Sequence, residues 1–239
     1  NLEKKLYLAL LQRGDVVFDV GAHHGYFTLL FSDLVGPDGE VHAFEPLPPT
    51  FARLREALQQ QQRFENVLLN NVACAEHACE IPLHLPDEDS DQASPRAQRE
   101  GSGRAAQQVS QLPVQAIRLD EYDRGRAAQR LDLVKCDVEG AELLALRGMM
   151  HKLARFRPLL VVETFAAWTA PFGYDPAILI AFLESVGYDA FYLVTDRLTR
   201  VCDACDTVAA RAARESVNVL CACAEQHADR LRLAAAFER

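Results

Sequence analysis

The segment 15–28 is the feature that most constrains the fold of this chain. Val16–Val20 is a short apolar run typical of a buried strand, and Tyr26–Leu34 continues with apolar residues at helical spacing. Between them lie Gly21 and Gly25, which permit tight backbone turns. A strand, a glycine turn and a helix in this order are typical of a ligand-binding turn, because open α/β sheets bind ligands beyond the carboxyl ends of their strands.

The residues of this turn argue against two common phosphate-binding motifs. A dinucleotide fingerprint has the pattern Gly-x-Gly-x-x-Gly, but Ala22, His23 and His24 follow Gly21, so that only one of the three glycines fits. A Walker loop ends in Gly-Lys-Ser or Gly-Lys-Thr, and the turn has neither ending. S-adenosylmethionine has a ribose and no phosphate, so it requires an acidic residue for the ribose hydroxyls without a pyrophosphate cradle.

Two acidic residues are suited to such a cofactor. Asp19 adjoins the turn, and Glu45 closes a second short strand over 40–44. Glu45 lies about twenty residues beyond the turn, the offset of the ribose carboxylate in a βαβ unit. Either residue alone is equally well an ordinary solvated carboxylate at a strand end. Together, at this spacing, they favour a cofactor site.

A second group of acids follows the predicted fourth strand. Leu131–Cys136 is apolar enough for a buried strand, and Asp137, Glu139 and Glu142 come after it. The fourth strand is expected beside the first, so Asp137 and Glu139 should face the same crevice as the glycine turn. Crowded carboxylates need a compensating cation or proton, and the sulfonium of S-adenosylmethionine is such a cation. The alternative places Glu139 and Glu142 in a first helical turn, where the dipole favours acids, and we prefer it for Glu142.

Alternating strands and helices predict an α/β fold with a Rossmann-like, doubly wound parallel sheet in a single domain over 1–239. The expected strands are 16–20, 40–44, 66–73, 131–136, 158–162, 190–194 and 216–223, and the expected helices are 2–11, 26–34, 50–62, 141–156, 175–187 and 227–237. Two further strands, 80–85 and 109–119, flank the polar stretch 86–108, which cannot pack a core. This stretch is interpreted as a surface loop, or as a lid over the acceptor.

The charge and the apolar runs limit the partners. A net charge of −9 argues against general binding to nucleic acid or to an anionic membrane, since both require a basic surface. No apolar run approaches the length that spans a bilayer, and no signal peptide is recognisable. We therefore expect a cytoplasmic protein whose partner is a small molecule.

The seven cysteines are expected to be reduced thiols that serve as small apolar residues. Cys202, Cys205, Cys221 and Cys223 have a spacing that also allows a zinc site. Because 217–223 has the pattern of a buried strand, packing is the preferred interpretation, and zinc stays open as the alternative.

These motifs resemble those of the FkbM-type family of S-adenosylmethionine-dependent methyltransferases over nearly the whole chain. The resemblance rests on 19–28, 35–39, 43–46, 66–67, 119–120, 135–142, 146–148, 157–158, Glu163 and 187–188, of which the Lys135–Glu142 segment is the most specific. It implies the class I methyltransferase fold, with seven strands in the order 3-2-1-4-5-7-6 and the last strand antiparallel. It also implies O-methylation of a hydroxyl on a sugar or secondary metabolite.

The resemblance assigns roles to individual residues. The cofactor-binding set is Asp19, Gly21, Ala22, His23 and Gly25 in and beside the turn, Glu45 for the ribose, Ala73 after the third strand, and Asp137 and Glu139 beside the methionine moiety and acceptor. Two positions depart from the family. His23 stands where the family usually has Asn, and Thr164 stands where relatives often have His.

Methyl transfer to an alcohol requires a held acceptor and a group that receives the hydroxyl proton. The candidates for this base are Asp137 first, then Glu163 and His24. Magnesium bound by Asp137 and Glu163 is an alternative way to activate the hydroxyl, since clustered carboxylates suit this ion. Two other functions compete: a nicotinamide-dependent oxidoreductase, disfavoured by Ala22 and His23, and an inactive binding module, disfavoured by the crowded carboxylates.

Overall fold

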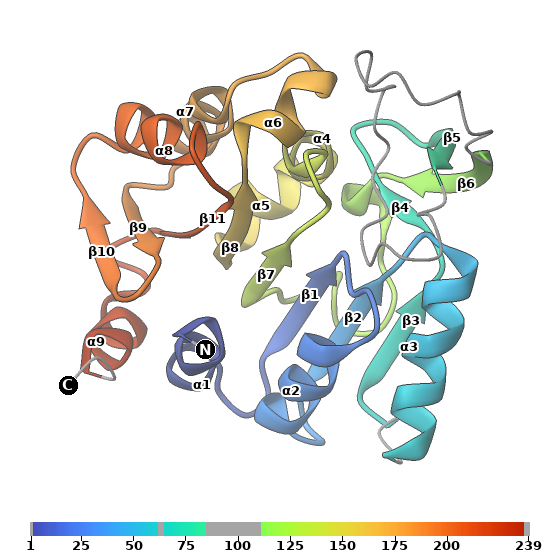
Figure 1. The fold of residues 1–239 in the computed structure, drawn as a ribbon. Coiled ribbons are helices and arrows are strands. Elements are labelled where there is room, and N and C mark those ends of the chain that lie inside the picture. Colours follow the sequence, from blue (N-terminus) through green and yellow to red (C-terminus); the bar gives the residue numbers. More distant parts are fainter. Residues whose placement is uncertain (1, 62–64, 85–110, 237–239) are drawn as a thin grey trace.

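A computed structural model describes residues 2–61, 65–84 and 111–236 of the chain, which form a large mixed sheet with helices on both faces (Figure 1). Within these residues the main sheet has eight strands in the order β10-β9-β11-β8-β7-β1-β2-β3. Its strands are β1 (Val16–Val20), β2 (Glu40–Phe44), β3 (Val67–Asn70), β7 (Leu133–Cys136), β8 (Leu159–Thr164), β9 (Ala190–Val194), β10 (Leu198–Val201) and β11 (Val217–Ala222).

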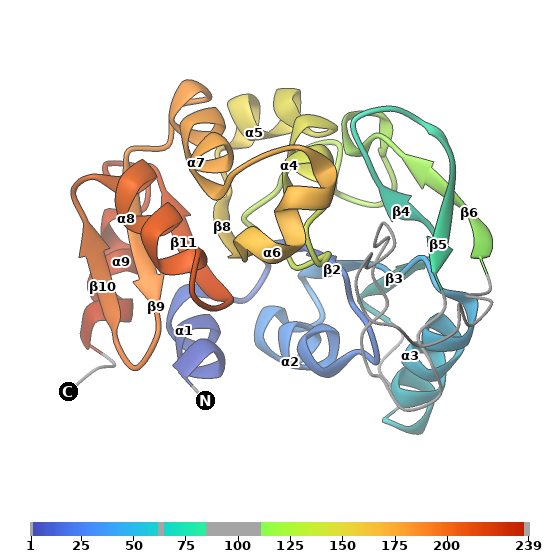
Figure 2. The same ribbon diagram turned by 45° about the horizontal axis from the view of Figure 1, so that its top comes forward.

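The helices form two layers because successive side chains of each central strand point to opposite faces. Val16 and Phe18 of β1 belong to one apolar cluster, and Val17 belongs to the other. Figure 2 shows α4, α5 and α7 on the first face and α1, α2 and α3 on the second. The helices are α1 (Leu2–Leu10), α2 (Tyr26–Val35), α3 (Pro48–Gln60), α4 (Glu142–Arg147), α5 (Met150–Phe156), α6 (Ala166–Thr169), α7 (Pro176–Ser185), α8 (Ala204–Ala212) and α9 (Ala228–Ala236).

The predicted fold class is confirmed. The predicted strands correspond to β1, β2, β3, β7, β8, β9 and β11, and their order in the sheet is the predicted 3-2-1-4-5-7-6. β11 pairs antiparallel with both β8 and β9, as expected of the last strand. The predicted number of strands was wrong, because β10 pairs with β9 as an additional edge strand.

The part of the chain between β3 and β7 forms a separate small sheet, where the doubly wound pattern would place a helix. It contains β4 (Ala73–Cys74), β5 (Cys79–His84) and β6 (Gln111–Ile117) in the order β4-β6-β5. The predicted third strand, 66–73, therefore ends early, and its last residue belongs to this second sheet. The segment 86–108, predicted as a loop or lid, lies outside the described residues.

The predicted helix over 141–156 is two helices, because a distant carboxylate caps the second one. Asp120 accepts hydrogen bonds from the backbone N–H groups of His151 and Lys152, at 3.1 and 3.0 Å, in the first turn of α5. At the break, a Cβ on Gly148 would lie 2.0 Å from the carbonyl oxygen of Ala75, so glycine is required for this approach. The cap comes from 31 residues away in the chain, so helical spacing alone did not reveal it.

The cysteines of the zinc alternative are spread over different environments. Cys221 is buried in β11, whereas Cys202 is exposed. Cys205 lies in α8, a helix that the sequence analysis missed, and Cys223 contacts the carbonyl oxygen of Gly187 at 3.2 Å. In the described part of the chain no group of three or more His, Cys, Asp or Glu side chains is arranged to hold a metal ion. The described helices also include none of the length and apolar character needed to cross a membrane.

A buried ion cluster joins the C-terminal helix to the start of the central strand. Asp15, immediately before β1, is fully buried and accepts hydrogen bonds from both terminal nitrogens of Arg230 in α9, at 2.7 and 2.9 Å. Arg130 contacts the same carboxylate at 3.0 Å and contacts Asp132 at 2.6 Å. Helix α9, which packs beside α1 (Figure 1), is therefore joined to the start of β1 through a charge that the interior must keep compensated.

Removing the Arg230 cation should destabilise the protein because it leaves the Asp15 carboxylate partly uncompensated. We expect Arg230→Met to lower the free energy of unfolding by about 3 kcal/mol in urea titrations. Arg232→Met is the matched control, since Arg232 lies on the same helix in an exposed pair with Asp229 and should cost less than about 0.5 kcal/mol. Equal effects of the two substitutions would contradict the role of the buried cluster.

Candidate active site

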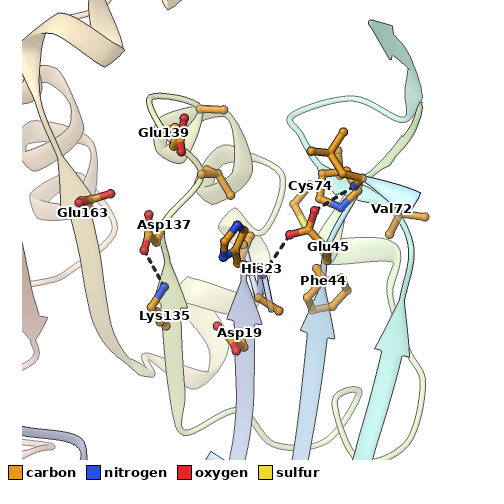
Figure 3. A pocket seen from close by; sticks show the side chains of 18 of the residues that line it. Asp19, His23, Phe44, Glu45, Val72, Cys74, Lys135, Asp137, Glu139 and Glu163 are labelled. Atoms are coloured by element: carbon orange, nitrogen blue, oxygen red, sulfur yellow. Dashed lines mark hydrogen bonds and ion pairs between the residues drawn. The ribbon is translucent and has the colours of Figure 1, made fainter. Parts of the chain in front are cut away.

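A cavity of about 490 Å³ lies at the carboxyl ends of β1, β2 and β7, the place predicted for the ligand. Of the predicted site residues, Asp19, Gly21, Ala22, His23, His24, Glu45, Ala73, Asp137, Glu139 and Glu163 line it. Figure 3 shows Asp137, Glu139 and Glu163 on one side of the opening and Glu45 with Val72 and Cys74 on the other. The topology thus gathers acids from four separate parts of the chain.

The glycine turn brings the ends of β1 and β7 into contact. Gly21 has φ of +85°, and a Cβ there would lie 1.8 Å from the carbonyl oxygen of Asp137. Gly25 is not among the residues that line the cavity. A Cβ on Gly25 would lie 2.5 Å from Leu54 Cδ1 of α3, so this glycine shapes the turn against a helix. The structure therefore assigns Gly25 a packing role, and its contact with the cofactor stays a prediction.

His23 adopts the left-handed backbone conformation, with φ of +50°. Asn, Asp and His tolerate this region better than other residues with a side chain, which explains why His can replace the Asn of the family pattern. In this conformation the His23 N–H donates a hydrogen bond to Glu45 Oε2 at 3.0 Å. The His23 ring lies 3.9 Å from that of His24, whose Nε2 accepts from Arg53 at 3.4 Å.

Glu45 is held rigidly at the end of β2. Its Oε1 accepts a hydrogen bond from the Leu47 N–H at 2.9 Å while Oε2 accepts from His23, and the side chain is 5% exposed. Burial raises the pKa of Glu45 to about 7, although these two backbone hydrogen bonds oppose the rise. The carboxyl group therefore changes charge near neutral pH, and its remaining lone pairs are available to ligand hydroxyls.

Asp19 lies beneath the turn and is fully buried. Its Oδ2 accepts a hydrogen bond from Thr28 Oγ1 at 2.6 Å, and its Oδ1 has no hydrogen-bond partner among the described residues. Burial raises the pKa of Asp19, while the nearby Lys135 ammonium opposes the rise. Asp19 lines the cavity, and its Oδ1 is a buried acceptor that the described residues leave unsatisfied.

Asp137 forms an ion pair with Lys135 of β7. The Lys135 Nζ lies 2.8 Å from Asp137 Oδ2. Burial opposes ionisation of Asp137, but Lys135 and further hydrogen bonds outweigh it and lower the pKa of this carboxyl. Burial likewise works against the Lys135 charge, yet the neighbouring Asp137 and Asp19 carboxylates raise the pKa of this lysine above its ordinary value. Both groups are therefore charged at neutral pH.

Glu163, at the end of β8, is the protonated neighbour of Asp137. Burial and the hydrogen bond to Asp137 raise the pKa of Glu163 to about 9. Ser216 Oγ donates a hydrogen bond to Glu163 Oε1 at 2.5 Å. The two carboxyl groups therefore hold one proton between them. The magnesium alternative finds no support among the described residues, which include no group of three or more His, Cys, Asp or Glu side chains arranged to hold a metal ion.

The two remaining acids differ in role. Glu142 is buried at the start of α4, where its Oε1 accepts hydrogen bonds from the N–H groups of Val138 and Gly140, each at 3.0 Å. It holds the loop before the helix, in agreement with the structural interpretation preferred for it. Glu139 precedes α4, with φ of +51°, so it does not lie in a first helical turn. Unlike Glu142, Glu139 lines the cavity.

Sequence reasoning missed several residues of the site. Lys135 was recognised only as part of a motif, although a lysine inside a buried apolar strand is itself a signal for a paired charge. Trp168 of α6 lines the cavity, and a Cβ on Gly140 would lie 2.2 Å from the Trp168 carbonyl oxygen. Ile81 and Leu83 come from the second sheet. Strands over 80–85 and 109–119 were predicted and correspond to β5 and β6, but their pairing into a sheet beside the cavity is a long-range contact that has no local sequence signature.

Comparison with solved structures identifies the fold as that of S-adenosylmethionine-dependent methyltransferases. The crystal structure of Methyltransferase FkbM from Methylobacillus flagellatus KT has a TM-score of 0.55 and 14% identity, covering 90% of this chain and 47% of that chain. A SAM-dependent methyltransferase from Aquifex aeolicus has a TM-score of 0.50 and 14% identity, and the match covers 93% of this chain and 88% of that chain. At these identities the likeness concerns the fold.

The family follows from the sequence comparisons. The family described as "Methyltransferase FkbM domain" matches residues 19–190, and the chain belongs to this family of methyltransferases. The 31-O-demethyl-FK506 methyltransferase FkbM of Streptomyces tacrolimicus is 32% identical over 58% of this chain and 61% of its own length. Methyltransferase sdnD of Sordaria araneosa is 28% identical over 76% of each chain. The match thus spans about three fifths of the Streptomyces protein and three quarters of the Sordaria protein.

The left-handed conformation at position 23 predicts which substitutions the turn accepts. We expect His23→Asn to keep the wild-type melting temperature, and His23→Val to lower stability by about 1 to 2 kcal/mol, because a β-branched residue is strained there. Differential scanning calorimetry of the two variants would measure this. A destabilised His23→Asn variant beside a stable His23→Val variant would contradict the assigned backbone conformation.

Proposed function

We propose that this protein transfers a methyl group from S-adenosylmethionine to a hydroxyl of a small-molecule acceptor such as a sugar or secondary metabolite. The observation that carries the proposal is the position of Asp137. Its carboxylate is kept ionised by Lys135 and lines the same cavity as Glu45 and the glycine turn. A base for a hydroxyl proton and a carboxylate suited to a ribose thus share one small-molecule site.

The residues present fit the cofactor. Glu45 has lone pairs free to accept from the two ribose hydroxyls, because its two backbone hydrogen bonds use one lone pair on each oxygen. Asp19 lines the same cavity, and its carboxyl group is suited to the amino group of the methionine moiety, directly or through water. Ala73 and Leu47 offer apolar surface beside Glu45 for the adenine. The related structure of SMU.1697c from Streptococcus mutans, with a TM-score of 0.50, is in complex with SAH.

The bound cofactor would supply an electrophilic methyl group on a sulfonium. The chain's own residues orient the acceptor, exclude water and receive its proton. Asp137 takes the hydroxyl proton as the new carbon–oxygen bond forms, because it is the ionised member of its pair with Glu163. Glu163 is protonated, and His24 already accepts a hydrogen bond from Arg53. Both residues are therefore weaker candidates for the base than Asp137. Most of the rate enhancement is assigned to positioning of the acceptor.

The acceptor class is supported by the relatives and by the wall of the cavity. The name of the Streptomyces relative, 31-O-demethyl-FK506 methyltransferase, specifies an oxygen of its acceptor. A relative from Haloferax volcanii, 27% identical over 72% of this chain, is a hexuronic acid methyltransferase. Glu139 lines the cavity on the side of Asp137 (Figure 3), Trp168 also lines it, and both would contact such an acceptor. The net charge of −9 supports a small molecule over nucleic acid or an anionic membrane.

Cofactor binding tests the first half of the proposal. In calorimetric titrations we expect saturable binding of S-adenosylmethionine and none of nicotinamide dinucleotides. Because ribose hydroxyls donate to the ionised form, and the pKa of Glu45 is about 7, affinity should rise about tenfold between pH 6 and pH 8. Glu45→Gln is the control: it removes this part of the pH dependence and leaves any titration of the ligand's own amino group. Absence of binding would favour an inactive methyltransferase fold, and binding of dinucleotides an oxidoreductase.

Loss of the base tests the second half. We expect Asp137→Asn to lower turnover by at least about 100-fold with a hydroxylated acceptor, while the affinity for S-adenosylmethionine changes little. Asp123→Asn is the matched control, because Asp123 pairs with the buried Lys152 at 3.0 Å and does not line the cavity. Near-normal turnover of Asp137→Asn, measured by formation of S-adenosylhomocysteine, would remove Asp137 from the proposed role.

A further inference from the structure

We propose that Lys135 is a positioning residue of the reaction, whose buried ammonium fixes Asp137 as the ionised member of the Asp137–Glu163 pair. The inference rests on the proposed function and specifies which residue keeps the proposed base, Asp137, ionised. Lys135 would touch neither the acceptor nor the transferred methyl group. It would act through the carboxylate that receives the proton.

The geometry around Lys135 holds the ammonium in one place. Lys135 lies inside β7, between β1 and β8, and is 3% exposed. Its Nζ lies 2.8 Å from Asp137 Oδ2 and 5.2 Å from the centre of the Phe27 ring of α2, a cation–π distance. A buried lysine with a carboxylate and an aromatic ring as fixed neighbours has little freedom to move away from Asp137 (Figure 3).

The charged groups that act on Lys135 come from β1, from α1 and from the residues after β7. Asp19 of β1 and Glu3 of α1 act on the ammonium together with Asp137. Tyr7 of α1 donates a hydrogen bond to Glu3 at 3.0 Å. The groups that act on Asp137 itself are Lys135, Glu163 of β8 and His23 of the turn, and Glu142 of α4 also interacts with it. The Lys135 ammonium therefore interacts electrostatically with three carboxyl groups, and it forms an ion pair with that of Asp137.

Glu163 provides the other half of the arrangement. Ser216 donates to Glu163 Oε1, and the neighbouring Asp137 carboxyl group raises the pKa of Glu163. With the cation beside Asp137, the shared proton belongs to Glu163, although the hydrogen bond from Ser216 opposes protonation of Glu163. During methyl transfer the oxygen–hydrogen bond of the acceptor breaks, the carbon–oxygen bond forms and the carbon–sulfur bond of the cofactor breaks. The proton goes to Asp137 and then to water.

Without the ammonium, Asp137 and Glu163 become two buried carboxyl groups that have lost the cation 2.8 Å from Asp137. The pair then retains protons to higher pH, because burial and mutual repulsion both disfavour the charged forms. Asp137 would be protonated over part of the neutral range and unable to accept the hydroxyl proton. The acidic limb of the pH–rate profile should therefore move to higher pH.

The test is a carboxyl titration that requires neither cofactor nor acceptor. Aspartate labelled with 13C at the side-chain carboxyl is incorporated, and the Asp137 resonance is identified by its loss in Asp137→Asn. We expect the midpoint of the Asp137 titration to rise by about one to three pH units in Lys135→Met, the effect of losing an adjacent opposite charge. Lys135→Arg keeps a cation and should leave the midpoint close to that of the wild type.

Lys152→Met is the matched control, because Lys152 is also a buried lysine paired with an aspartate, Asp123, away from the cavity. It should leave the Asp137 titration unchanged. The same midpoint in folded Lys135→Met and wild-type protein would overturn the inference. If Lys135→Met does not fold, the wild-type titration decides, since a midpoint of Asp137 at or above its ordinary range would also overturn it. Failure of the proposed function would instead appear as absent S-adenosylmethionine binding with the carboxyl titration intact.

Discussion

The parallel pairing of β1 with β7 is the constraint on which the rest of the site depends. It aligns Asp19 with Lys135 and Val20 with Cys136, so two acidic segments far apart in the chain end at the same edge of the sheet. The glycine at position 21 then allows the turn to approach the Asp137 carbonyl, where any side chain would collide. The cavity exists because this contact leaves the space beyond it open.

Gathering acids at one edge creates an electrostatic problem that the chain solves locally. Lys135 compensates Asp137, Glu163 keeps a proton, and Glu142 is satisfied by backbone N–H groups. The cost of burying each charge is thus met by a different partner, and the partners set which groups are ionised at neutral pH. The opposite end of β1 uses the same principle, with Asp15 held between two arginines.

How well an element was predicted depends on how local its causes are. The seven predicted strands and their order followed from apolar runs and from the alternation with helices, which arise from short segments. The break between α4 and α5 depends on Asp120, and β10 depends on pairing with β9, so neither has a cause within its own segment. Most predicted cavity residues line the cavity because they directly follow strands, whereas Gly25 packs against α3 instead.

The sequence by itself determined the fold class, the family and the position of the ligand site, because these follow from strand-end motifs that act over a few residues. The tertiary structure decided the charge state of each acid, since burial and partners from β7, β8 and the loop before α4 assign it. It also decided that Lys135 belongs to the site and that a second sheet forms one wall. Desolvation and long-range pairing are properties of the packed chain, and no local pattern encodes them.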